Sequence, residues 1–410
     1  MHRSRCWNFS RDVDNTWLSH DIQLLIDALI SASDNTCNPF IDLRPGKQMY
    51  TLHGMMCSYY TAKTRAYLSY KHIPFVETHD ASVYQERMRP IVGFTRFPVL
   101  ENDDGEVIQD TTVIIDTLEN RYPERPAFPD DPVLMLVTRI VEFFIDEFWV
   151  VTAMHTRWND PDGKRFATNE FYMCFGDEGD EQEDWSCGAA VSRQMQAHLP
   201  GMGISTESGQ QVIQRLLEEA TPLLNKALGP RKFAFGERAS LIDCCLFTGY
   251  FAHHYRDNAV SQHYLKTEAP ELSYFLDSMQ AAFSAPADGE LAMTDEFLAY
   301  LKYLGPIAAA WAMSARQLAQ PILEQAQQGE ALQQSLPTEI QIFDQTFKRG
   351  SSIFCAWKGQ RIQEQYETLS DNDRKRADEL MAQIGWEEFL STSIGIRMER
   401  VGYDLQRSPL

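Results

Sequence analysis

The feature that most constrains the fold is a succession of short apolar runs and helical stretches between residues 49 and 122. The runs MYTLH and IPFVET have the pattern of strands, and TAKTRAYLSYKH between them has helical spacing. FPVLE and EVIQ predict two further strands joined by the turn NDDG, and DTTVIIDTLENRY predicts a closing helix. The order strand, helix, strand and then strand, strand, helix predicts an α/β domain around a mixed four-stranded sheet.

The rest of the chain has mainly helical patterns. YPERPAFPDDP carries four prolines in eleven residues, which is typical of a linker. Helical spacing follows it, is lost across the acidic run GDEGDEQED, and returns later, where FCAWKGQRIQEQYETL predicts a solvent-facing helix. We therefore expect an N-terminal extension at 1–47, the α/β domain at 48–125, a helical domain at 131–305 with an acidic insertion near 159–203, and a C-terminal helical extension at 306–410.

Charge and cysteine content exclude several classes of function. A formal net charge of -21 repels nucleic acid and anionic membranes. The eight cysteines show no spacing that suits zinc, which predicts no metal site and a reduced, cytoplasmic protein. The first thirty residues have no continuous apolar core, so we expect neither a signal peptide nor a membrane span.

Several stretches resemble glutathione transferases. CSYYTAKTRAYLSYKHIPF is similar to the family's strand-to-helix segment, and RFPVLENDDGEVIQDTTVIIDTLENRYP to its proline strand, hairpin and acidic helix start. FAFGERASLIDCCLFTGYFAHHY resembles the motif that opens a buried helix in the family's second domain. The resemblance covers about residues 49–285 and implies a cytosolic-type member with a thioredoxin-like N-terminal domain, an all-α helical-bundle domain, extra C-terminal helices and glutathione as co-substrate.

The catalytic assignment depends on one residue of register. In the resemblance Ser58 falls on the family's catalytic hydroxyl or thiol, and Cys57 lies one place earlier. If Ser58 faces the glutathione sulfur, its hydroxyl stabilises a thiolate that attacks an electrophile. If Cys57 does, a mixed disulfide and thiol transfer become the expected chemistry. We favour Ser58, because Lys63 and Arg65 match the family's helix in that register.

The resemblance also implies a glutathione site. Pro98 is expected to be cis, and Phe97 to pair through its backbone with the glutathione peptide, with Arg96 beside it. Asp110 and Thr111 match the family's acidic-hydroxyl pair at a helix N-terminus, which receives the γ-glutamyl end. Seen in isolation, Asp110 would be a helix cap.

The second substrate is expected between the two domains, against the helix VTRIVEFFIDEFWVVTAMHTRWND. The aromatic residues of this helix recur on more than one face, so most must be core. The candidate contacts with a small hydrophobic electrophile are Tyr59, Trp149, His155 and Trp158.

Three functions remain open from the sequence. The first is a glutathione transferase, and the second is a non-catalytic module of the same fold that binds a ligand or a protein. The third is a thiol transferase that works through Cys57. The resemblance suggests a homodimer.

Overall fold

The computed structural model describes residues 48–80, 83–93, 96–175, 186–229, 231–332 and 335–409. The expected N-terminal extension at 1–47 and the acidic run at 176–185 lie outside the described residues. Among the described residues, no helix combines the length and the apolar composition that a membrane crossing requires.

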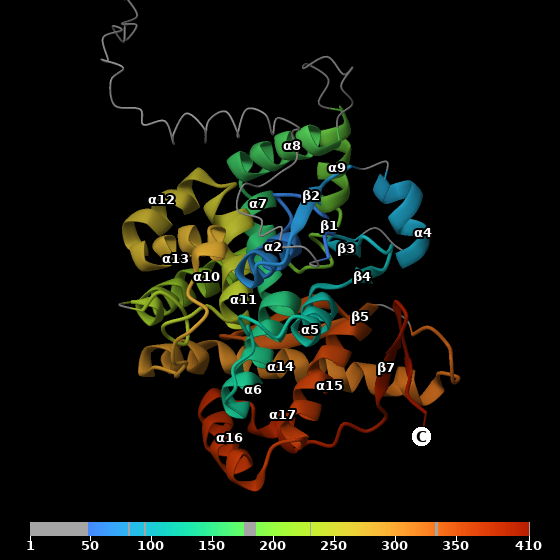
Figure 1. The fold of residues 1–410 in the computed structure, drawn as a ribbon, viewed down its shortest axis with the longest axis vertical. Helices are drawn as coiled ribbons and strands as arrows, with labels where there is room; N and C mark the ends of the chain where they lie inside the picture. The colour runs from blue at the N-terminus through green and yellow to red at the C-terminus, as the bar shows by residue number, and fades with distance from the viewer. Residues whose placement is uncertain are drawn as a thin grey trace, which may run out of the picture. The chain divides into compact units, whose positions relative to one another are not determined.

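The predicted sheet is confirmed. Its strands are β1 (Tyr50–His53), β2 (Phe75–Thr78), β3 (Val99–Asn102) and β4 (Val107–Gln109), in the spatial order β2-β1-β3-β4. Strands β1 and β2 are parallel, and the other two neighbouring pairs are antiparallel. Helix α2 (Tyr59–Lys71) follows β1, helices η1 (Tyr84–Met88) and α4 (Arg89–Val92) follow β2, and α5 (Thr111–Arg121) follows β4 (Figure 1).

Each face of the sheet packs against different helices. Leu52, Leu100 and Ile108 belong to the main core together with residues of α2 and α5. On the opposite face, Val99 forms a small separate cluster with Tyr84, Met88 and Val92 of η1 and α4. Alternate residues of one strand thus enter different cores, as the two-residue period of a strand requires.

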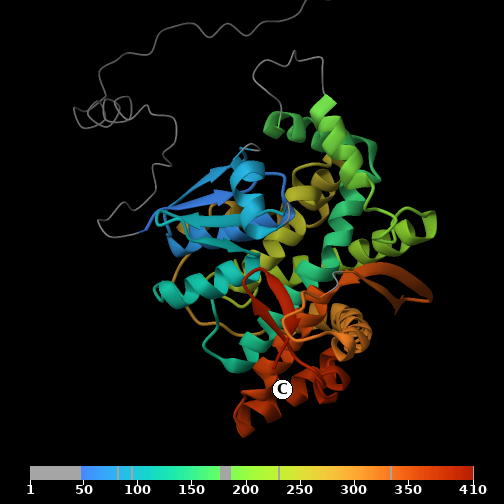
Figure 2. The same ribbon diagram turned by 90° about the vertical axis from the view of Figure 1, so that its right-hand side faces the viewer.

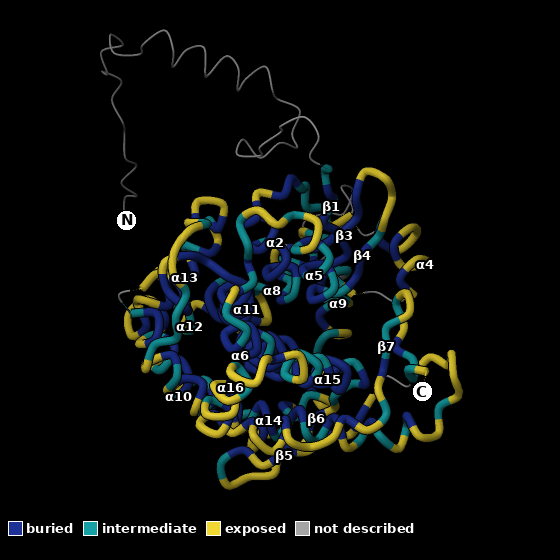
Figure 3. Tube along the Cα trace, turned by 60° about the horizontal axis from the view of Figure 1, so that its bottom comes forward, coloured by how far each residue is buried: buried dark blue, intermediate teal, exposed yellow. Residues whose placement is uncertain are grey.

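The region after the sheet is mostly helical, as expected. It begins with α6 (Pro132–Phe144), a π-helical segment η2 (Ile145–Trp149) and α7 (Val150–Trp158). Further helices are α10 (Glu207–Leu228), α11 (Leu241–Tyr250), the π-helical η3 (Phe251–Tyr255), α12 (Ala259–Glu268), α13 (Pro270–Gln280), the short η4 (Ala282–Ser284) and α14 (Asp295–Gln325). Helix α11 is buried along its whole length at the centre of this region (Figure 3).

A capping box starts α11. The Asp243 carboxylate accepts hydrogen bonds from the backbone N–H groups of Ala234 (2.7 Å) and Ser240 (2.8 Å) and from the Ser240 hydroxyl (2.9 Å). Burial raises the pKa of Asp243 to about 6, against the pull of these hydrogen bonds. The predicted structural role of this motif agrees with its full burial.

We expect Asp243→Ala to lower the free energy of unfolding at pH 7 by about 1–3 kcal/mol, because buried N–H groups lose their acceptor. The native pKa lies above that of an unfolded aspartate, so folding favours the protonated form. The difference between wild type and variant should therefore shrink as the pH rises from about 4 to about 6. Urea unfolding of both proteins at several pH values measures this difference in the free energy of unfolding. Asp371→Ala, at an exposed first turn, is the control, and an equal loss in both variants would contradict the assignment.

Two helices occupy the stretch at 159–203 where the sequence lost its periodicity. They are α8 (Pro161–Phe175) and α9 (Ser186–Gln196), on either side of the acidic run. Gly163, Ala167 and Phe171 of α8 recur every four residues and are buried. The expectation of a loop-like insertion was therefore wrong for these residues, because a narrow apolar stripe was overlooked.

The C-terminal region is not entirely helical, which corrects a second expectation. Strands β5 (Ser335–Ile342) and β6 (Gln345–Ser352) form one antiparallel hairpin, and β7 (Met398–Val401) and β8 (Asp404–Arg407) form another. Residues along β5 alternate between exposed and buried, a strand pattern that the sequence already contains. The helices of this region are α15 (Ile353–Glu367), α16 (Asp371–Ile384) and α17 (Glu387–Ser391).

The expected boundary between residues 305 and 306 falls inside α14. This helix continues through Gly305 and Pro306 to Gln325. A Cβ atom on Gly305 would lie 2.0 Å from the backbone oxygen of Ile384. The glycine therefore permits close packing of α14 against the end of α16, and it does not end the helix.

Candidate functional site

The register of the sheet brings three distant segments to one end of it. His53 of β1 is paired with Val99 of β3, and Val99 is paired with Gln109 of β4. The chain leaves β1 toward Ser58, enters β3 from Phe97 and leaves β4 into Asp110. The glutathione-site candidates of the sequence are therefore neighbours at this end of the sheet.

Ser58 and Cys57 lie at the N-terminus of α2 in different surroundings. Ser58 is the N-cap, and its half-buried side chain accepts a hydrogen bond from the N–H of Thr61 (3.3 Å). No described residue accepts from its hydroxyl, so the proton of the hydroxyl can be donated elsewhere. Cys57 is fully buried, and its carbonyl accepts from Arg157 (2.8 Å). Only Ser58 can meet a ligand without rearrangement.

The bond between Phe97 and Pro98 is cis, as expected. A residue that the sequence reasoning missed holds this segment. The hydroxyl of Tyr84 donates to the carbonyl of Arg96 (2.5 Å) and accepts from its N–H (2.9 Å), and its ring packs on Phe97 at 4.4 Å between centroids. Within the described part of the chain, the N–H and C=O of Phe97 form no hydrogen bond.

Asp110 caps α5 and still has acceptor capacity. Its Oδ1 accepts from the N–H groups of Thr112 (2.9 Å) and Val113 (3.4 Å). No described residue donates to its Oδ2. Asp110 has a positive φ of 81°, while Thr111 begins the helix and is buried. One carboxylate oxygen thus serves the helix, and the other is available to a cation.

The candidate substrate contacts are not brought together. Trp149 is 0% exposed and packs on Phe144 and Tyr250, so it offers no surface to a substrate, which corrects that expectation. Tyr59 is also buried, and its hydroxyl donates to the carbonyl of Ile145 (2.9 Å).

The two other candidates lie near the end of α7. Trp158 is 5% exposed and stacks on Phe171. His155 is half-buried and hydrogen-bonds Gln214 (3.2 Å) and Asn159 (2.9 Å). Of the four candidates, His155 keeps the largest accessible surface.

The π-helical segment η2 lies between α6 and α7 and contacts α2 of the α/β domain. Its backbone carbonyls at Ile145 and Asp146 accept hydrogen bonds from the hydroxyls of Tyr59 and Tyr60, the latter at 2.8 Å. A π-helix disturbs the regular pairing of helical carbonyls, and here tyrosines of α2 satisfy them.

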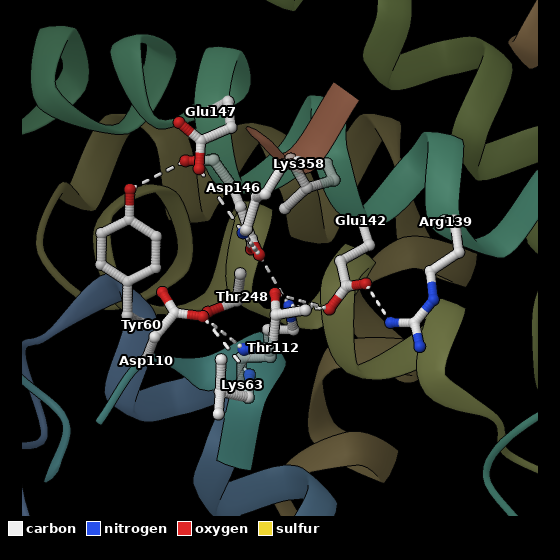
Figure 4. Close-up of polar contacts among 12 residues, drawn as sticks. Tyr60, Lys63, Asp110, Thr112, Arg139, Glu142, Asp146, Glu147, Thr248 and Lys358 are labelled. Atoms are coloured by element: carbon white, nitrogen blue, oxygen red, sulfur yellow. Dashed lines mark hydrogen bonds and ion pairs between the residues drawn. The ribbon is translucent and has the colours of Figure 1, made fainter. Parts of the chain in front are cut away.

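A buried ion cluster lies where α2, α6, η2 and α15 meet (Figure 4). We define it as Lys63, Arg139, Glu142, Asp146, Glu147 and Lys358. Lys63 donates to Glu142 (2.8 Å) and to Asp146 (2.7 Å), and Lys358 donates to the same oxygen of Asp146 (2.6 Å). Arg139 pairs with Glu142 at 2.7 Å, and Lys358 lies 3.4 Å from Glu147.

Opposite charges within the ion cluster shift the pKa values of several members toward the ionised form. Burial alone would lower the pKa of Lys63, but the groups around it, Asp146 foremost, together outweigh burial and hold that pKa well above its usual value. Burial would raise the pKa of Glu142, yet Lys63 and Arg139 keep it well below its usual value. The opposite charges around Lys63, Glu142 and Lys358 thus favour the ionised forms of these three side chains, while burial raises the pKa of Glu147.

Side chains from the C-terminal region reach the outer strand of the sheet, β4. Arg400 of β7 donates to the carbonyl of Gln109 (2.9 Å), next to Asp110, and Tyr403 donates to the carbonyl of Val107 (2.9 Å). Figure 2 shows this region in orange and red below the blue strands. No local sequence signal pointed to these contacts.

The described residues contain no group of three or more histidine, cysteine or acidic side chains placed to hold a metal ion.

Comparison with known proteins identifies the first domain. Residues 52–126 match the family model described as glutathione S-transferase, N-terminal domain. The chain is similar to a solved glutathione S-transferase from Methylobacterium radiotolerans in complex with glutathione sulfonate, at 23% identity over 60% of this chain and 99% of that one, with a TM-score of 0.35. It is also similar to the β-etherase LigF from Sphingobium sp., at 19% identity over 58% of this chain and 97% of that one, with a TM-score of 0.39. FzlA from C. crescentus is 19% identical over 61% of this chain and 97% of that one, with a TM-score of 0.38. No curated protein matches the chain.

Proposed function

Residues 52–126 are a glutathione S-transferase N-terminal domain, and from this premise we propose that the protein binds glutathione where Ser58, Phe97 and Asp110 meet. The observation that carries the proposal is that three residues at one end of the sheet present polar groups that form no hydrogen bond with any described residue. They are the Ser58 hydroxyl proton, the Phe97 backbone pair and the Asp110 Oδ2.

Each group matches a part of glutathione. The peptide of the ligand pairs with the N–H and C=O of Phe97, and its γ-glutamyl ammonium binds Asp110. The γ-glutamyl carboxylate lies at the N-terminus of α5, where the N–H of Thr111 donates to no described residue. The Ser58 hydroxyl then donates to the glutathione sulfur and stabilises its thiolate.

We propose that this thiolate attacks a small hydrophobic electrophile. The half-buried His155 is the substrate candidate in α7 that burial leaves open. The burial of Cys57 argues against a thiol transferase that begins with this residue, because an external disulfide cannot reach its sulfur. A non-catalytic binding or interaction protein of the same fold is the alternative, because the positive charges of Arg400 and Lys358 compete with the ammonium of glutathione for the carboxylate of Asp110.

A cytoplasmic location fits the free thiols of the described cysteines. The expected homodimer stays a prediction, and light scattering of the purified protein tests it.

Asp110→Asn is expected to weaken glutathione binding about 10- to 100-fold, because a charge-assisted hydrogen bond to the ligand's ammonium is lost. Asparagine is itself a good N-cap, so the helix should keep its start. Isothermal titration calorimetry with glutathione measures the change.

Asp131→Asn is the matched control. Asp131 caps α6 by accepting hydrogen bonds from the N–H groups of Val133 (2.8 Å) and Leu134 (3.2 Å), the same two helix positions that Asp110 caps in α5. The glutathione affinity of the Asp131→Asn variant should equal that of wild type. Wild-type protein that binds no glutathione at millimolar concentration would refute the proposed function, and equal affinities of both variants would refute the role of Asp110.

A further inference from the structure

Arg400 of the β7–β8 hairpin contacts the residue that precedes Asp110. Its Nη2 donates to the backbone carbonyl of Gln109 (2.9 Å) and to the side-chain oxygen of the same residue (3.3 Å). That carbonyl belongs to the peptide bond between Gln109 and Asp110, the N-cap of α5. Tyr403 of the same hairpin donates to the carbonyl of Val107 (2.9 Å) and holds the hairpin against β4. A guanidinium from the C-terminal region is therefore fixed beside the N-terminus of α5.

This guanidinium has no partner of opposite charge in contact with it. No described carboxylate lies at salt-bridge distance from Arg400, and its Nη1 is buried and forms no hydrogen bond with any described residue. Burial lowers the pKa of Arg400, and the carboxylate of Asp110 opposes this shift without cancelling it. The neighbouring Arg361, in contrast, pairs with Asp116. A buried N–H group without an acceptor costs free energy, and a ligand oxygen would remove that cost.

Groups of both charges are available at this place. No described residue donates to Oδ2 of Asp110, and the N–H of Thr111 donates to no described residue. Asp110 and Arg400 are both half-buried, so a ligand can approach them from solvent. The carboxylate attracts an ammonium, while the N–H of Thr111, the positive end of the α5 dipole and the guanidinium attract a carboxylate. The site is therefore complementary to a free α-amino acid group, which carries an ammonium and a carboxylate on one carbon atom.

We propose that Arg400 binds the α-carboxylate of the γ-glutamyl residue of glutathione and makes the site specific for ligands with a free α-amino acid group. The ligand's carboxylate meets the charge of Arg400, which leaves the carboxylate of Asp110 to the ligand's ammonium. The inference rests on the proposed glutathione site and adds to it a residue from outside the matched range 52–126. Arg400 holds the end of the ligand and takes no part in the chemistry of the sulfur.

The test compares the binding of three ligands to the full-length protein by isothermal titration calorimetry. They are glutathione, 4-aminobutanoyl-cysteinyl-glycine, which lacks the α-carboxylate, and glutaryl-cysteinyl-glycine, which lacks the ammonium. Arg400→Gln should weaken the binding of glutathione and of the glutaryl peptide about 10- to 100-fold, because a charge-assisted hydrogen bond to the carboxylate is lost. It should not weaken the binding of the 4-aminobutanoyl peptide, which has no carboxylate for Arg400 to bind.

Two further variants separate binding from folding. Arg400→Lys keeps the positive charge and should retain more affinity for glutathione than Arg400→Gln does. Tyr403→Phe, the matched control, removes the other contact of the hairpin with β4 and should bind all three ligands as wild type does.

Two results would overturn the proposal. One is an equal loss of affinity for all three ligands in Arg400→Gln, which would show that Arg400 only supports the structure, and the other is an unchanged affinity for glutathione in this variant. Either result leaves glutathione bound to the wild type and so spares the proposed function. Wild-type protein that binds none of the ligands would instead refute the glutathione site itself.

Discussion

Replacing Lys358 by methionine is expected to lower the free energy of unfolding by about 3–5 kcal/mol, because it leaves buried carboxylates without their cation. Lys358 is the only described partner that Glu147 has at salt-bridge distance, and it shares Asp146 with Lys63. Methionine fills a similar volume, so the loss reports the charge. Urea unfolding followed by circular dichroism measures it.

Lys348→Met is the matched control. Lys348 pairs with Glu339 at 3.2 Å, but its side chain is 75% exposed, so its removal should cost less than about 1 kcal/mol. In addition, the double variant Lys358→Met/Glu147→Gln should be more stable than Lys358→Met alone, because it also removes a buried carboxylate that has lost its cation. Equal stability of the two single variants would show that the ion cluster does not anchor the C-terminal region.

The second large effect is expected at the catalytic step. Ser58→Ala should lower the turnover of glutathione with an activated aryl halide by about 100- to 1,000-fold, since a donor to the developing charge is lost. It should also raise the pKa of bound glutathione, which the ultraviolet absorbance of the thiolate reports without an electrophile. Glutathione affinity should change much less, because Phe97 and Asp110 remain.

The variant Cys57→Ser distinguishes a catalytic role of Ser58 from one of Cys57. If Ser58 stabilises the thiolate, this variant should keep most of its turnover, and a small effect of Ser58→Ala together with a large effect of Cys57→Ser would contradict that role. Protein that binds glutathione but turns over no electrophile in any form would favour the non-catalytic alternative. Thr64→Ser, a buried change elsewhere in α2, controls for general disturbance of the helix.

The first domain was predictable because its signals are local. Alternating apolar residues, the NDDG turn and the proline before Val99 each define one element, and adjacent elements then fix the sheet. The register of the sheet in the structure places Ser58, Phe97 and Asp110 together. Tyr84 was missed because its hydrogen bonds to Arg96 depend on the path of the chain between η1 and β3, which carries no pattern of its own.

The contribution of the C-terminal region was not predictable. The segment around Lys358 alternates acidic and basic residues, and we expected it to face solvent, yet most of α15 is buried. Lys358 meets Asp146 across 212 residues of sequence. A charged residue inside a helix gives the same local pattern whether water or a buried carboxylate receives it, and only tertiary packing decides. In contrast, alternate residues of β5 are buried, and its sequence contains the pattern that is typical of a strand.

The contacts of Arg400 and Tyr403 with β4 have a consequence for solubility. Strand β4 is the outer strand of its sheet, and the carbonyls of Val107 and Gln109 are the groups on which another chain could pair. The side chains of the β7–β8 hairpin cover these carbonyls. The β7–β8 hairpin thus shields the edge of the four-stranded sheet from strand-to-strand aggregation, and loss of its two contacts would expose an edge on which a second copy of the chain could pair.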